Sequence, residues 1–178
     1  MQFISAMLFI AVALSSAVQE PYSTGWNKKS TLSSDRALEF PGIVLEPGTY
    51  VIRLKESTET RSVVEICNQD ESQILGTVLA VPDHELRPDD NSEFIYFNVA
   101  RVNPEPVRTW FYSGDLIGME FVYPKARAKE IAKAADTHVM ASNSNNKDDV
   151  IVAVTPNGKE VVIDEPRPAQ TARKKPTK

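Results

Sequence analysis

The chain has 178 residues, 42% of them hydrophobic and 25% charged, and its 24 acids against 20 bases leave a formal net charge of -4. This composition is that of an ordinary globular protein, so it excludes a wholly disordered chain, a collagen and a membrane protein with several spans. A mild excess of acids gives no general attraction for polyanions, and we therefore expect no nucleic acid among its partners.

Residues 1–17 are predicted to be a signal peptide. Residues 3–14 are an unbroken run of apolar and small side chains, and residues 15–17 are small, as a signal peptidase requires. The run is shorter than the ~20 residues of a membrane-spanning helix, although no Lys or Arg precedes Lys28. We expect export to the periplasm or the outside of the cell, with no transmembrane anchor after cleavage.

Residues 18–36 are predicted to be a flexible lead-in, because Pro, Gly and hydroxyl side chains occur there with little periodicity. From residue 37 the chain changes character: segments rich in Val, Ile, Tyr and Phe alternate with turn clusters, at the spacing of about 8 to 12 residues typical of antiparallel β proteins. We therefore expect an all-β domain over residues 37–140, an antiparallel β-sandwich of about seven short strands.

The strands are predicted from alternation and from β-forming residues, at residues 50–55, 62–68, 74–82, 93–100, 108–113 and 119–123. Residues 74–82 are apolar on both faces, as in a strand at the centre of a sheet, and Gly76 is expected at a bulge or a close approach. In residues 62–68, Val64 and Ile66 are the expected inward pair.

One short helix is predicted at the C-terminal end of the domain. Pro124 suits the start of a helix, and residues 125–135 are almost all strong helix formers. Their apolar stripe is narrow, so the helix is expected to cover an end or edge of the strands.

Residues 141–178 are predicted to be a polar linker, a weak hairpin and a basic tail. The turn sequence at residues 156–158, Pro-Asn-Gly, lies between two valine-rich arms and indicates a hairpin at residues 150–163. An isolated hairpin is marginally stable in water, so it docks, pairs with another chain or forms only transiently.

The metal-ligating residues do not form a known motif, and we expect no metal and no cofactor. His84 and His138 are far apart, and Cys67, the one cysteine, lacks the neighbours of a copper site. Oxygen ligands do crowd one loop, at Asp83, Glu85, Asp89, Asp90, Asn91 and Glu93. Calcium is one interpretation, but Phe94 stands where an EF-hand needs glycine, so a solvated acidic loop is preferred.

Four residues are the candidates for a binding site. Trp110 and Tyr112 share one face of a predicted strand and offer a stacking platform for sugar rings or a peptide. Asp115 and Glu120 follow closely and are also the best candidates for a catalytic carboxylate pair. The alternative interpretations are a second buried aromatic layer and an aspartate that stabilises a turn.

Two stretches are similar to an uncharacterised family of secreted bacterial β proteins. They are residues 45–50, Leu-Glu-Pro-Gly-Thr-Tyr, and residues 110–125, which contain Trp-Phe-Tyr-Ser-Gly-Asp and end in Phe-Val-Tyr-Pro-Lys. The resemblance covers residues 37–135 and implies the export segment and the domain limits. It implies no activity, ligand or residue role.

The function expected from these observations is that of a non-catalytic binding or structural module in the cell envelope or outside the cell. Its partner would be an envelope polymer or a protein, and the oligomeric state is left open. One alternative is a hydrolase that acts on polysaccharide or peptide through Asp115 and Glu120. Another is an assembly subunit that uses residues 150–163 for β-strand addition.

Overall fold

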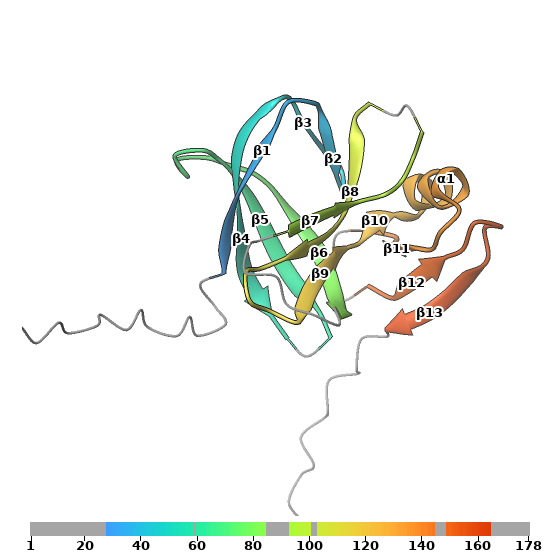
Figure 1. The fold of residues 1–178 in the computed structure, drawn as a ribbon. Coiled ribbons are helices and arrows are strands. Elements are labelled where there is room, and N and C mark those ends of the chain that lie inside the picture. Colours follow the sequence, from blue (N-terminus) through green and yellow to red (C-terminus); the bar gives the residue numbers. More distant parts are fainter. Residues whose placement is uncertain (1–27, 59, 85–92, 101–102, 145–148, 165–178) are drawn as a thin grey trace, which may run out of the picture.

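The computed structural model describes residues 28–58, 60–84, 93–100, 103–144 and 149–164. The larger sheet contains β1 (Lys29–Ser34), β2 (Leu38–Phe40), β3 (Ile43–Leu45), β4 (Gly48–Ser57), β5 (Ser62–Asn68), β6 (Ile74–His84), β7 (Glu93–Tyr96), β8 (Glu105–Phe111) and β9 (Ile117–Phe121). The smaller sheet contains β10 (Tyr123–Pro124), β11 (Val139–Ser142), β12 (Ile151–Val154) and β13 (Glu160–Asp164), and the helix α1 is Lys125–Ala135. The described chain is therefore mostly β with one short helix, as the sequence predicts (Figure 1).

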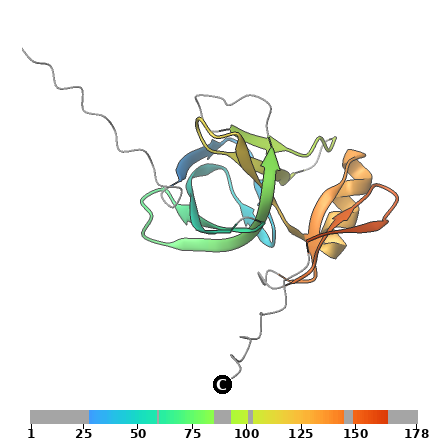
Figure 2. The same ribbon diagram turned by 90° about the horizontal axis from the view of Figure 1, so that it is seen from below.

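The larger sheet has the strand order β1-β4-β5-β6-β9-β8-β2-β3, and β7 pairs with β8. All its pairs are antiparallel except β2 with β8. Register shifts interrupt the pairing of β4 with β5, β5 with β6 and β7 with β8. Such bulges bend strands and increase their twist, and the sheet curls strongly around an interior without closing (Figure 2).

The predicted sandwich of about seven strands differs in detail from these two sheets, which hold thirteen strands. Strands β2, β3 and β10 have only two or three residues, too few for an alternating pattern to be visible. Strand β1 lies in the predicted flexible lead-in, where it pairs with β4 and buries Ser30 and Leu32. With Leu32 as its one apolar residue, β1 has no hydrophobic pattern of its own.

The core of the larger sheet is aromatic and aliphatic. Phe40 on β2 packs edge-on against Phe121 on β9, with their ring centroids 5.1 Å apart. Val64 and Ile66 on β5 are fully buried, which confirms the predicted inward pair. Burying such side chains contributes about 1.5 to 3 kcal/mol each.

Strand β6 lies between β5 and β9, which confirms that it is central. The predicted close approach at Gly76 is also confirmed, because a Cβ atom there would lie 1.9 Å from Cδ1 of Ile43. The side chain of Ile43, on β3, therefore occupies the space that a side chain on residue 76 would need.

Helix α1 has the predicted bounds and begins directly after Pro124. It buries Ala128, Ile131 and Ala132 and contacts β10, β11 and β12. Among the described residues, no helix is long and apolar enough to cross a bilayer.

The predicted hairpin is present and docked. Strands β12 and β13 flank a turn in which Gly158 has φ +80°, and β12 is buried along its whole length. Strand β12 also pairs with β11, which spans the predicted domain boundary at residue 140. On the helix, Lys125 and Lys129 both contact Glu160 of β13, at 2.9 and 3.0 Å. The hairpin thus belongs to the same small sheet that α1 covers.

Candidate functional site

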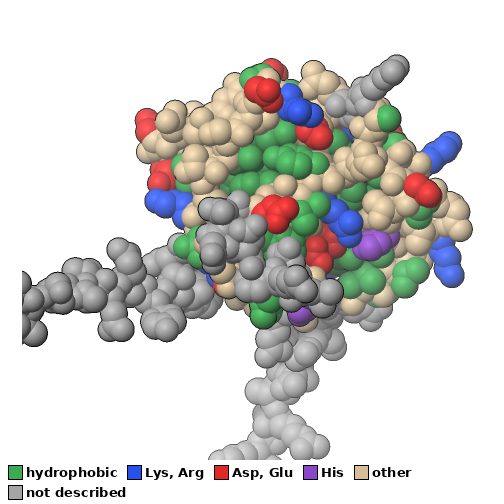
Figure 3. All heavy atoms as spheres, viewed as in Figure 1, with side chains coloured by type: hydrophobic (Ala, Val, Ile, Leu, Met, Phe, Trp, Pro, Cys, Tyr) green, Lys and Arg blue, Asp and Glu red, His purple; other side chains and the backbone are tan. Residues whose placement is uncertain are grey.

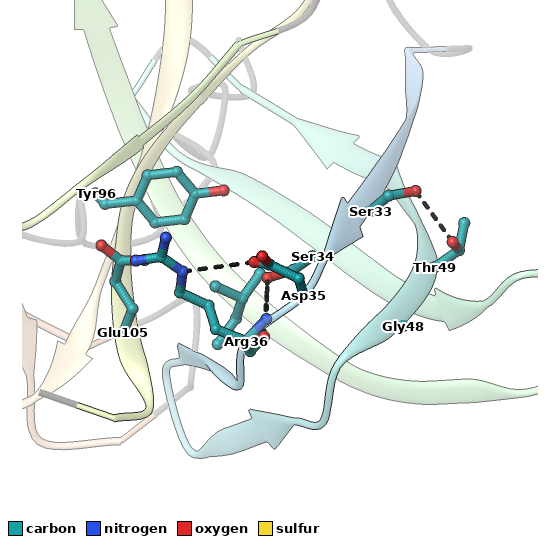
Figure 4. A pocket seen from close by; sticks show the side chains of 9 residues that line it. Ser33, Ser34, Asp35, Arg36, Gly48, Thr49, Tyr96 and Glu105 are labelled. Carbon is teal, nitrogen blue, oxygen red and sulfur yellow. Dashed lines mark hydrogen bonds and ion pairs between the residues drawn. The ribbon is translucent and has the colours of Figure 1, made fainter.

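The two ends of the larger sheet meet at an open groove of about 710 Å³, which we call the seam groove (Figure 4). Strands β1 and β4 form one wall, strands β2, β7 and β8 form the other, and the short link between β1 and β2 crosses from wall to wall. The lining residues are Ser33, Ser34, Asp35, Arg36, Leu38, Gly48, Thr49, Tyr96 and Glu105. The groove exists because the curled sheet does not close.

Hydroxyl groups fix the wall formed by β1 and β4. The hydroxyls of Ser33 and Thr49 share a hydrogen bond of 3.0 Å. The hydroxyl of Ser34 donates to the carbonyl of Arg36 at 2.8 Å and accepts from its backbone N–H at 3.2 Å. These bonds hold the turn after β1, as serine does in turns generally.

An ion pair joins the link between β1 and β2 to the start of β8. Nη1 of Arg36 donates to Oε2 of Glu105 at 3.2 Å, and Nε of Arg36 lies 3.7 Å from Oδ1 of Asp35. The backbone N–H of Glu105 bonds to the carbonyl of Ala37 at 2.9 Å, which fixes the start of β8 beside the link. Two carboxylates and one guanidinium give the lining a formal charge of -1.

Tyr96 stands at the wall formed by β7 and β8, and its ring borders the groove in Figure 4. The ring is half-buried and packs against the core. Burial raises the pKa of the Tyr96 hydroxyl, and the nearby Glu105 carboxylate adds to the effect. A phenol is neutral at physiological pH even with its ordinary pKa, and the upward shift reinforces this, so the Tyr96 hydroxyl has a proton to donate.

Trp110 is not a stacking platform, because it is fully buried. Its indole Nε1 donates to the hydroxyl of Ser30 at 2.9 Å. Tyr112 is partly buried and meets Trp110 edge-on, with the ring centroids 6.5 Å apart. The face that these two residues share is the interior of the curled sheet, so the interpretation as a buried aromatic layer fits Trp110.

Asp115 and Glu120 are held by different bases. Asp115 forms an ion pair with Lys28, and Oε1 of Glu120 accepts from Nε of Arg108 at 3.0 Å. The structure thus does not present the two as one paired site, and the hypothesis that they act together in hydrolysis stays a prediction.

Glu120 belongs to a second polar cluster, on the outer face of β6, β8 and β9. Glu120 is only 3% exposed, and Nη2 of Arg108 also lies 3.4 Å from Nε2 of His138. Beside them, the hydroxyl of Thr109 donates to Oδ2 of Asp83 at 3.0 Å. Figure 3 shows acidic, basic and histidine side chains side by side on this face.

The pKa of Glu120 is raised to about 7, chiefly by burial; Arg108 opposes the shift, and the nearby Asp83 carboxylate adds to it. A carboxyl group with this pKa exchanges a proton near neutral pH. The sequence does not predict Arg108 or the role of Asp83 in this cluster. The cluster depends on the cross-strand register, which places Thr109 of β8 opposite Glu120 of β9 and is not visible in the sequence.

Among the described residues, no three His, Cys, Asp or Glu side chains come together as metal ligands. Cys67 is buried, and burial raises the pKa of its thiol. Residues 85–92, which carry most of the acidic loop, lie outside the described residues, so the calcium interpretation stays untested.

No family model, no curated protein and no solved structure matches this chain. The resemblance to secreted bacterial β proteins therefore stays a hypothesis, and the site has to be interpreted from its own geometry.

Proposed function

We propose that the protein is an exported, non-catalytic binding module of the cell envelope or the extracellular space, and that the seam groove is its binding site. One observation carries the proposal: the groove measures about 710 Å³ and presents hydroxyls, an ion pair and a tyrosine ring together. This volume lies within the range of roughly 300 to 1,000 Å³ that is typical of ligand sites. The signal-like residues 1–17 support export.

The chemistry of the groove favours binding over turnover. A serine nucleophile needs a neighbouring base, but Ser33 and Ser34 bond to Thr49 and to the backbone of Arg36. No histidine is among the described residues that line the groove. The Glu105 carboxylate is paired with Arg36.

Co-sedimentation with envelope fractions tests the proposal. We expect the purified protein to sediment with the envelope fractions. For Arg36→Glu, we expect the amount of protein that stays bound to the fractions (the retention) to fall at least tenfold, because this substitution breaks the ion pair with Glu105 and makes the groove more negative. The matched control is Lys133→Glu, the same charge change at an exposed position of α1. Equal losses in both variants would remove the groove as the site, and retention no better than that of an unrelated β protein would remove the binding function.

Export has its own test. The protein from fractionated cells is expected in the periplasm or the medium, with Val18 as its first residue after cleavage. N-terminal sequencing of the secreted material checks this, and a cytoplasmic chain that still begins at Met1 would contradict it.

A second candidate function is assembly with another copy of the chain through strand addition, and the edge of the smaller sheet favours it. Strand β13 is the last strand in that sheet's order, with a partner on one side only among the described residues. Its Val161, Val162 and Ile163 are 43%, 53% and 50% exposed. An edge of β-branched residues without Lys or Pro lacks the usual protection against pairing.

Point substitution tests this candidate better than deletion of residues 141–178, because Ile151–Val154 is buried and its removal would open the core. Val162→Lys should convert an oligomer to a monomer in light scattering. Val44→Lys is the matched control, since Val44 on β3 is 54% exposed. An unchanged mass for Val162→Lys would remove the candidate.

A further inference from the structure

The residues that line the seam groove favour one chemical class of ligand over others. This inference rests on the proposed function, in which the groove is a binding site. The net charge of -1 from Asp35, Glu105 and Arg36 disfavours a polyanion, because like charges repel at close range. The one aliphatic lining residue, Leu38, is 1% exposed, so the groove presents no aliphatic side chain to a lipid tail. What remains on the walls is a set of hydrogen-bonding groups and one aromatic ring.

Tyr96 supplies the ring and an available donor. In Figure 4 its hydroxyl points across the groove toward Ser34 and Asp35. Of these two residues, Ser34 bonds to the backbone of Arg36, and Asp35 lies 3.7 Å from Nε of Arg36. On the wall of Tyr96 itself, Glu105 accepts from the Arg36 guanidinium. A half-buried phenol with an apolar ring and a polar tip suits a ligand that is itself amphipathic, such as a sugar ring.

Arg36 and Glu105 supply donors and acceptors at fixed positions. The Arg36 side chain is 62% exposed, so it remains accessible while Nη1 is held by Glu105. Charged hydrogen-bonding groups form stronger bonds than neutral ones, and vicinal hydroxyls of a sugar can donate to the carboxylate while they accept from the guanidinium. The open shape of the groove suits a segment of a chain better than an enclosed small molecule.

We infer that the seam groove binds an uncharged polysaccharide, with one sugar ring against Tyr96 and its hydroxyls on Arg36 and Glu105. The wall of β1 and β4 is preorganised for this ligand by the bond between Ser33 and Thr49. Preorganisation reduces the entropy that is lost on binding.

Titration calorimetry with sugars of matched length tests the inference. The probes are cellohexaose and the hexamer of N-acetylglucosamine, both neutral, and hexagalacturonate, which carries a carboxylate on every ring. We expect at least one neutral hexamer to bind at least tenfold more tightly than hexagalacturonate. Tyr96→Phe should weaken that binding about fivefold through the lost hydroxyl, and Tyr96→Ala should weaken it more than tenfold through the lost ring.

Tyr50→Phe is the matched control, because the Tyr50 hydroxyl donates to the carbonyl of Glu46 at 2.7 Å and does not line the groove. Tighter binding of hexagalacturonate, equal losses in Tyr50→Phe and Tyr96→Phe, or binding of an unstructured peptide in place of both neutral hexamers would overturn the inference. If neither neutral hexamer binds while retention on envelope fractions still depends on Arg36, the sugar class is wrong and the proposed function stands. If Arg36→Glu does not change retention on envelope fractions, the seam groove is not the binding site, and this part of the proposed function is wrong.

Discussion

The indole Nε1 of Trp110 donates a hydrogen bond to the hydroxyl of Ser30 at 2.9 Å, although 80 positions separate the two residues in the chain. Trp110 lies on β8 and Ser30 on β1, which are not neighbours in the sheet. The bond therefore crosses the interior and ties β1, the first strand in the order, to β8 near the other end of the curled sheet. The seam groove lies at the same meeting of strands, so this buried contact supports both of its walls.

Ser30→Ala is expected to destabilise the protein by about 1 to 3 kcal/mol, because it leaves the buried indole N–H without its acceptor. Urea denaturation measures the change in the free energy of unfolding. Ser33→Ala is the control, since its hydroxyl is exposed and bonds only at the surface, and a change within about 0.5 kcal/mol is expected there. Equal effects of the two substitutions would show that the Trp110 contact does not stabilise the fold.

Gly118→Ala is expected to cost about 1 to 3 kcal/mol of stability, as overpacking usually does. A Cβ atom on residue 118 would lie 2.6 to 2.8 Å from the ring of Phe111, which is itself buried. Thermal unfolding of the single variant and of the double variant with Phe111→Leu checks the cause. The smaller side chain should recover part of the loss when alanine is present, and a purely additive result would contradict the contact.

Glu120 is expected to make the protein less stable as the pH rises through about 7. Its pKa is raised in the folded state from the usual 4.5 to about 7, so the folded protein binds the proton more tightly than the unfolded chain. The stabilising contribution is complete below pH 4.5 and is lost as the pH passes about 7; the difference corresponds to about 3 kcal/mol. Urea denaturation at pH 5 and pH 8 measures it.

Glu120→Gln should remove this contribution to the pH dependence, because glutamine does not titrate. Glu130→Gln is the control, since Glu130 is an exposed residue of α1 that pairs with Arg127. The same loss of stability between pH 5 and pH 8 in wild type and Glu120→Gln would show that the buried carboxyl is not its source.

Glu65 is expected to have the opposite effect on the pH dependence of stability: its stabilising contribution is lost as the pH falls into the acid range. Hydrogen bonds from Lys55 and Arg53, at 2.9 and 2.8 Å, lower the pKa of this buried carboxyl below its usual value. Its contribution is present above the pKa of the unfolded chain and is lost as the pH falls through the lower folded value. Glu65→Gln should therefore be destabilised at pH 7 and should lose less further stability than wild type on acidification, as followed by tryptophan fluorescence. A wild-type acid profile in this variant would contradict the prediction.

The helix and the hairpin are predictable from local sequence because short-range chemistry decides them. Residues 125–135 are strong helix formers after Pro124, and Gly158 adopts the positive φ that the turn requires. The centre of the larger sheet is predictable for a related reason, since residues 78–81 are apolar on both faces and are buried on both.

The location of the binding site could not be predicted in this way, as Trp110 and Tyr112 illustrate. Alternation correctly places Trp110 and Tyr112 on one face, where their rings meet. It does not tell the inside of a sheet from the outside, because both faces of an aromatic strand follow the same two-residue period. The structure turns that face to the interior, and the open site is elsewhere.

From the sequence alone, one can predict a β-rich chain, the positions of its central strand, helix and hairpin, and the residues of β5 that point inward. The seam groove and the environment of Glu120 become visible only in the folded chain. The groove joins residues 33–36 to Tyr96 and Glu105, and it needs β2 to pair with β8 and the curled sheet to bring its ends together. These are contacts between distant segments, and no local pattern encodes the register and curvature that bring them together.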